Sequence, residues 1–213
     1  MTRLAAAILC ATAGLAAAAD VPIAGKSVRV GAATAAKRTF AFVSATQTTI
    51  ATPLPDPTTG ATLRVFVSSG PGQCHAEIVL PGGFWSPIAG NGAQKGWRYR
   101  DQSASAQGIR AVTIANRKGG GKITIKGRGA FPCGLETTQS GPLAVELRVA
   151  ATRWCASFGG NVRTNSVGHY RALDAAAPAA CLDHDVTVAS LNVLHGIFCP
   201  GGTNGCRPQA AKA

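Results

Sequence analysis

The feature that most constrains the fold is an alternation of apolar and polar residues that runs, in short segments, through residues 26–158. In the clearest segment, LAVELRV at 143–149, Leu or Val occupies every second position. Side chains of a β-strand point alternately to its two faces, so this pattern predicts strands with one buried face. Helical periodicity is absent from the region. About nine such segments, with no alternation of strands and helices, predict an all-β fold of the antiparallel two-sheet sandwich type.

Turn-forming residues separate these segments. PLPDPTTG at 53–60, SSGPGQ at 68–73 and GNG at 90–92 combine Gly, Pro, Asp and Asn, which favour turns for distinct conformational reasons. The glycines at 119–121 predict the turn of a basic hairpin whose lysines point to solvent. The order of the strands stays open between an immunoglobulin-like and a jelly-roll-like arrangement.

The N-terminus has the layout of an export signal. Arg3 precedes an apolar run that ends in small residues before Asp20. We therefore predict a secretory signal peptide over residues 1–19, a mature chain that begins near Asp20, and a secreted or periplasmic location.

The strand-like alternation of apolar and polar residues ends after Phe158. We predict a β-sandwich domain over 20–158 and a connector over 159–183, with a brief helical turn at 172–177 that Pro178 ends. Residues 184–213 would then hold one terminal strand, at 186–192, and a tail.

Six cysteines follow the predicted signal, and an even number in an exported chain predicts disulfides. They are Cys74, Cys133, Cys155, Cys181, Cys199 and Cys206. Closeness along the chain favours Cys199 with Cys206 and Cys155 with Cys181, which leaves Cys74 for Cys133. The alternative is a zinc site, which lacks the close Cys-x-x-Cys pairs of strong zinc motifs. Its ligands would come from Cys181, His184, His195, Cys199 and Cys206.

Positive charge is concentrated in one region. The chain has a formal net charge of +12, and residues 95–128 hold nine Lys or Arg against the single acid Asp101. Such a region attracts anions, and nucleic acid, acidic glycans and lipopolysaccharide are candidate partners. A basic surface that is only solvated is the alternative.

Aromatic residues interleave with arginines in WRYRD at 97–101. Exposed together, they would form a stacking platform for single-stranded nucleic acid or sugars. In a strand, however, Trp97 and Tyr99 share one face while Arg98 and Arg100 share the other. The pattern therefore favours buried aromatics and exposed arginines.

One C-terminal segment, DVTVASLNVLHG at 185–196, bears on catalysis. It resembles the opening strand of the endonuclease/exonuclease/phosphatase superfamily, the fold of pancreatic deoxyribonuclease. The resemblance implies that Asn192 helps to hold the scissile phosphate at a site that uses a divalent cation such as Mg²⁺. The residues after Asn192 include no Asp or Glu to hold that cation, so the resemblance implies a truncated hydrolase. The alternative is a terminal strand that adds to the sandwich.

The upstream region resembles a secreted accessory module of delta-proteobacterial type. The resemblance is carried by GWRYRD, the basic hairpin, and RWCASFGG followed by APAAC. It implies a β-sandwich and export, without a substrate. We therefore expect a secreted, non-catalytic β-sandwich module, the leading part of a larger exported protein, that needs no cofactor. A truncated metal-dependent phosphodiesterase or nuclease is the alternative.

Overall fold

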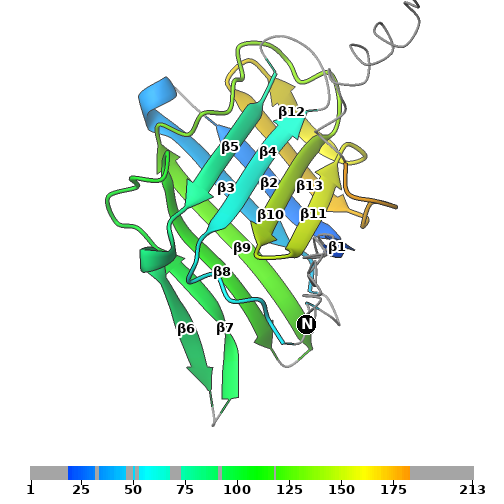
Figure 1. Ribbon diagram of the computed structural model, residues 1–213. Helices are drawn as coiled ribbons and strands as arrows, with labels where there is room; N and C mark the ends of the chain where they lie inside the picture. Colours follow the sequence, from blue (N-terminus) through cyan, green and yellow to red (C-terminus); the bar gives the residue numbers. More distant parts are fainter. Residues whose placement is uncertain are drawn as a thin grey trace, which may run out of the picture. The chain divides into compact units, whose positions relative to one another are not determined.

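The computed structural model describes residues 19–31, 34–46, 50, 53–67, 73–90, 93–117 and 119–182, which form a β-sandwich (Figure 1). The all-β fold class is confirmed. In these ranges thirteen strands lie in two sheets, one of five strands and one of eight. Two short 3-10 helices, Ala35–Lys37 (η1) and Gly82–Phe84 (η2), accompany them. No helix in the described ranges is long enough or apolar enough to cross a membrane.

The smaller sheet has the strand order β1-β11-β10-β4-β5. Its neighbours are antiparallel except at one edge, where β1 runs parallel to β11. The expected antiparallel arrangement therefore holds for every pair of this sheet but one. The strands are β1 (Ala19–Pro22), β4 (Ala61–Val67), β5 (His75–Leu80), β10 (Leu143–Val149) and β11 (Thr152–Phe158).

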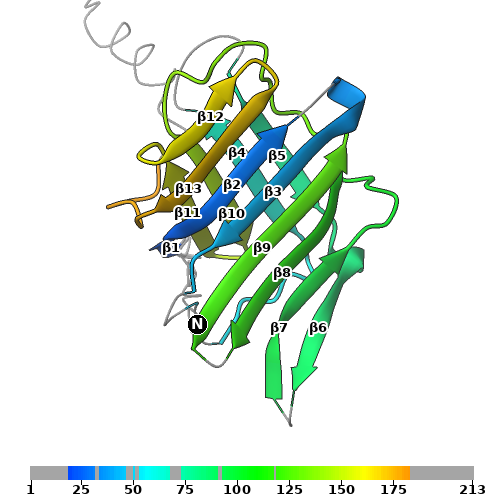
Figure 2. The same ribbon diagram turned by 180° about the vertical axis from the view of Figure 1, so that it is seen from behind.

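The larger sheet is antiparallel throughout, with the order β12-β13-β2-β3-β9-β8-β7-β6 (Figure 2). Strands from both ends of the described chain meet in it, because β13 pairs with β2. The strands are β2 (Gly25–Gly31), β3 (Arg38–Ser44), β6 (Trp85–Gly90), β7 (Ala93–Arg100), β8 (Ile109–Arg117), β9 (Gly120–Gly129), β12 (Val162–Ser166) and β13 (His169–Ala175).

The core lies between the two sheets and is built from the residues that the alternation predicts to point inward. Leu63 and Val65 of β4 are fully buried, as are Val112 and Ile114 of β8. Burial of side chains of this size stabilises a fold by about 1.5–3 kcal/mol each. Aromatic rings join the core from both layers, and Phe40 stacks on Phe131 with ring centroids 4.6 Å apart.

The prediction of a connector over 159–183 is wrong for residues 162–175. Residues 162–175 form β12 and β13, so the sandwich extends past Phe158, and the predicted helical turn at 172–177 is absent. Tertiary contacts explain the difference, because β13 pairs along β2 and buries Tyr170 and Ala172. The Tyr170 hydroxyl also donates a hydrogen bond to the carbonyl of Phe158 at 2.7 Å.

The basic hairpin is confirmed, but its turn is tighter than predicted. Arg117 of β8 pairs with Gly120, so the glycines at 120 and 121 already belong to β9. Gly121 has a packing reason to lack a side chain. A Cβ atom there would lie 2.4 Å from Cγ1 of Ile50, which is buried against this part of the sheet.

Two of the three predicted disulfides lie in the described residues, and both are confirmed. Cys74 bonds to Cys133, and Cys155 bonds to Cys181. Cys199 and Cys206 lie outside the described residues. The second bridge attaches Cys181 to the outward side of β11, because the neighbouring Trp154 and Ala156 belong to the core.

The outer side of the five-stranded sheet carries charges of alternating sign from one edge to the other. Arg64 forms ion pairs with Glu77 at 3.4 Å and Glu146 at 3.9 Å. Arg153 lies 3.9 Å from Glu146 and donates to Asp20 of β1 at 2.8 Å. These hydrogen bonds from Arg153 lower the pKa of Asp20 and attach the edge strand to the sheet.

Candidate anion-binding surface

The outward side of the eight-stranded sheet collects basic side chains from four strands, and we call it the basic face. In these strands the apolar residues point into the core, so the intervening positions face solvent. Lys122 is half-buried and the other basic residues of the face are exposed. Its members are Arg29, Arg98, Arg100, Lys122, Lys126, Arg128 and Arg171.

Register places four of these residues in one row across the sheet. Arg171 lies directly opposite Arg29. Across the next strands, Ala41 lies between Arg29 and Lys126, and Ala111 lies between Lys126 and Arg100. Neighbouring strands are about 4.8 Å apart, so the row extends over roughly 24 Å from Arg171 to Arg100. The face therefore presents a line of positive charge that runs perpendicular to the strands.

The one acid of residues 95–128 does not neutralise the face. Asp101 is buried in the loop between β7 and β8, where its carboxylate accepts hydrogen bonds from Ser103 at 2.6 Å and Ser105 at 2.8 Å. A third hydrogen bond comes from the backbone N–H of Ala106 at 3.2 Å. Burial alone would raise the pKa of Asp101, but these hydrogen bonds outweigh it and lower the pKa to about 2. The negative charge of Asp101 therefore stabilises the loop and does not face the basic side chains.

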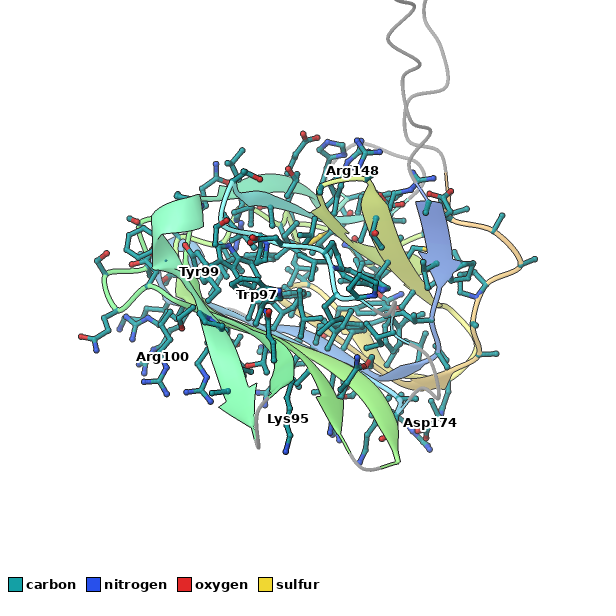
Figure 3. The ribbon with its side chains drawn as sticks, turned by 60° about the horizontal axis from the view of Figure 1, so that its bottom comes forward. Lys95, Trp97, Tyr99, Arg100, Arg148 and Asp174 are labelled. Carbon is teal, nitrogen blue, oxygen red and sulfur yellow. A yellow bond between two sulfur atoms is a disulfide. The ribbon has the colours of Figure 1, made fainter. Side chains whose placement is uncertain are left out.

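The aromatic residues of β7 point into the protein. Trp97 is 7% exposed and Tyr99 is fully buried, whereas Arg98 and Arg100 are exposed. Figure 3 shows Trp97 and Tyr99 between the layers and Arg100 pointing outward. Burial, with the nearby charge of Asp101, raises the pKa of Tyr99 to about 12. The predicted orientation is confirmed, and the stacking platform is not formed by these residues.

Sequence reasoning found part of this face and missed the rest. The basic region 95–128 supplies β7 and β9, but Arg29 and Arg171 come from strands near the two ends of the described chain. They join the face because β13 pairs with β2 and β2 pairs with β3. Alternation marks Arg29 as an outward residue, but the strand order that brings it beside Arg171 is not visible in the pattern.

The predicted catalytic residue Asn192 lies outside the described residues. So do four of the five residues of the alternative zinc site, namely His184, His195, Cys199 and Cys206. The fifth, Cys181, is bonded to Cys155, so its sulfur is not a thiolate ligand in this structure. Within the described ranges no group of three His, Cys, Asp or Glu side chains is placed to hold a metal ion.

Glu146 is the one carboxylate in the described residues whose pKa is raised. Burial is the main cause, opposed by the positive charges of Arg153 and Arg64. Perturbed carboxylates occur at functional sites and also in structural ion-pair networks. Here the two flanking arginines and the edge residue Asp20 make a charge network across the smaller sheet. We therefore assign Glu146 a structural role.

Comparison with family models finds no match, and no curated protein or solved structure is significantly similar to the chain. The resemblances to the endonuclease/exonuclease/phosphatase superfamily and to a secreted accessory module stay predictions. The basic face is the feature of the described chain that bears most directly on function.

Proposed function

We propose that the chain is a secreted, non-catalytic binding module that attaches to acidic glycans through the basic face. The observation that supports this most strongly is the one-sided charge of that face. Its strand positions hold seven Lys or Arg and, in the described residues, a single acid at the end of β13, Asp174. A surface of this kind concentrates polyanions in its neighbourhood.

The shape of the face favours an extended polymer. The residues between the basic side chains are small, and Ala41 and Ala111 separate the charged positions of the row. A sheet surface with small spacers lets a linear chain lie across several strands without steric obstruction. Each basic side chain can then meet a separate acidic group along the polymer.

The chemistry of the face favours glycans over single-stranded nucleic acid. Proteins that bind single-stranded nucleic acid without sequence preference combine basic grooves with exposed aromatic rings on which bases stack. Trp85, Trp97 and Tyr99 of the neighbouring strands are buried, and no aromatic side chain lies on the described basic face. The two confirmed disulfides suit an oxidising compartment outside the cytosol.

Heparin chromatography of the mature chain tests the proposal. The test variant replaces Arg100 and Lys126 with Ser, and the control variant replaces with Ser Lys37 and Arg148, which are exposed outside the basic face. Both variants lose two positive charges. We expect retention at low salt, elution at clearly lower salt for the test variant, and a small change for the control.

Two results would contradict the proposal. Equal shifts for the two variants would show that retention follows net charge and not the basic face. Tighter binding to a single-stranded oligonucleotide than to an acidic oligosaccharide of the same charge would overturn the choice of glycan. Circular dichroism of each variant confirms that the fold is intact before retention is compared.

A further inference from the structure

Two arginines of the basic face lie directly opposite one another on neighbouring strands. Arg171 of β13 pairs in register with Arg29 of β2, at the end of the sheet that Figure 2 shows beside β12. Residues in such a pair have Cβ atoms about 4.5–5.5 Å apart, and like charges placed there destabilise the sheet. The arrangement therefore opposes folding unless an anion neutralises it.

No ion pair in the described residues neutralises the two arginines, and Asp174 is the acid that lies on the same face. Arg38, Arg64 and Arg153 each form an ion pair with a carboxylate, but neither Arg29 nor Arg171 does so. Both side chains are exposed on the outward face. Two adjacent guanidinium groups are thus available to one ligand.

A hollow lies on each side of the pair. The first, about 240 Å³, is lined by both arginines with Thr164 and His169. The second, about 530 Å³, is lined by both arginines with Lys26 and Asp174 among others. Pockets for drug-sized ligands are about 300–1,000 Å³, so the first hollow fits a single anionic group and the second fits a neighbouring unit of a polymer.

Gly31 helps to shape the first hollow. It lies opposite His169, and a Cβ atom at this position would come within 3.3 Å of the imidazole Nδ1. The absence of a side chain leaves the imidazole room beside the arginine pair. His169 and the Thr164 hydroxyl therefore add hydrogen-bonding groups to the two guanidinium forks.

We propose that Arg29 and Arg171 together bind one phosphate monoester group. The inference rests on the proposed function for the polymer that carries this group, a phosphorylated acidic glycan. A phosphate monoester carries a charge of about −1.5 to −2 and three acceptor oxygens, which matches two adjacent guanidinium forks. A sulfate ester has the same tetrahedral shape but a single charge. The pair therefore selects the monoester by charge.

Glucose 6-phosphate and glucose 6-sulfate are the probes, because they differ in the charge of the same substituent. Isothermal titration calorimetry gives the affinity, and the NMR signal of the His169 imidazole, assigned with His169→Gln, reports binding at this place. We expect a Kd on the order of 1 mM for the phosphate and at least tenfold weaker binding of the sulfate. Equal affinities would overturn selection of the monoester.

Three variants locate the site. Arg171→Ser should weaken phosphate binding by about tenfold or more, because one bidentate charge-assisted contact is lost. Arg171→Lys should also weaken it, since an ammonium group lacks the planar fork. Arg100→Ser, on the same face, should change it less than about twofold. Wild-type affinity in Arg171→Lys, or an equal loss in Arg100→Ser, would refute a bidentate site.

The melting temperature provides a second measurement of binding, and it also reports the stability of each protein without ligand. At one ligand concentration, glucose 6-phosphate should raise the Tm of the wild-type chain clearly and the Tm of Arg171→Ser much less. Without ligand, Arg171→Ser should be at least as stable as wild type, because the like-charge contact is removed. A clear loss of stability in this variant would contradict the repulsion on which the inference depends.

Heparin retention separates failure of this inference from failure of the proposed function. Retention of the wild-type chain on heparin without binding of glucose 6-phosphate overturns the phosphate site and leaves the proposed function standing. Arg171-dependent binding of glucose 6-phosphate by a chain that heparin does not retain supports the site and overturns the glycan-binding module.

Discussion

Replacing Asp101 with Asn removes the charge that organises the loop between β7 and β8. The loop needs support because two of its non-glycine residues, Ala104 and Gln107, have positive φ angles of 57° and 45°. Asp101 holds it through three hydrogen bonds, from the Ser103 and Ser105 hydroxyls and the Ala106 N–H. Asn keeps one acceptor oxygen but places an amide N–H donor where the second carboxylate oxygen of Asp101 accepts hydrogen bonds.

Hydrogen bonds to a charged group contribute about 1.5–3 kcal/mol each, and Asn retains part of this set. We therefore expect the free energy of unfolding at pH 7 to fall by about 2–3 kcal/mol. For a domain of this size each kcal/mol corresponds to roughly 2–4 °C, so the Tm should fall by about 5–10 °C. Urea unfolding followed by tryptophan fluorescence measures the difference.

The loss of stability in Asp101→Asn should become smaller as the pH falls. The pKa of Asp101 is about 2 in the folded chain, below its ordinary value of 3.8. A depressed pKa contributes stability that is present above the ordinary pKa and is lost as pH falls through the folded value. The difference in the free energy of unfolding between wild type and Asp101→Asn should therefore shrink between about pH 4 and pH 2. The decrease should be about 1–2 kcal/mol once solvent screening is allowed for.

Glu136→Gln is the control. Glu136 is exposed and forms a surface ion pair with Arg38 at 3.0 Å, a contact expected to contribute less than about 1 kcal/mol. A free energy of unfolding for Asp101→Asn within about 0.5 kcal/mol of wild type at pH 7, the usual range for surface substitutions, would refute this role of Asp101. An equal difference between the two proteins at pH 2 and pH 7 would refute it as well.

Three further predictions concern the cysteines and catalysis. Replacing Cys155 and Cys181 together with Ala should lower stability by about 3.5 kcal/mol, from the loop of 26 residues that the bridge closes. Thiol titration of the denatured, unreduced chain without residues 1–19 should find no free thiol, and two or more would refute full pairing. With magnesium, manganese or calcium, the chain should not nick plasmid DNA above background, because no carboxylate follows Asn192. Nicking that requires metal and disappears in Asn192→Ala would prove this wrong.

The alternation of apolar and polar residues predicts the fold class because the core residues are large. Leu143, Val145 and Leu147 are larger or more apolar than the residues between them, Ala144 and Glu146, and all three are buried. The same rule fails for β13, where Ala172 is the inward residue and the adjacent alanines suggest a helix. A small residue contributes little to the pattern, so pairing with β2 decides the conformation there.

The candidate site was predictable only where its residues are close in sequence. The exposed side of β7 follows from Trp97 and Tyr99 being apolar, which makes Arg98 and Arg100 outward residues. The Arg29–Arg171 pair depends on strand order, and non-local pairing leaves no trace in the local pattern. Disulfide pairing lies between these cases, because closeness along the chain suggested Cys155 with Cys181 and the remaining pair followed.

The parallel pairing of β1 with β11 has a consequence for how the chain folds during synthesis. Asp20 and Arg153, which join these strands, are 133 residues apart in sequence. A chain that emerges from its N-terminus therefore presents β1 long before its partner exists, and completing that sheet edge is a late event. β1 has four residues and ends in Pro22, which donates no hydrogen bond to a neighbouring strand. A strand so short offers little template for pairing with other chains while it waits.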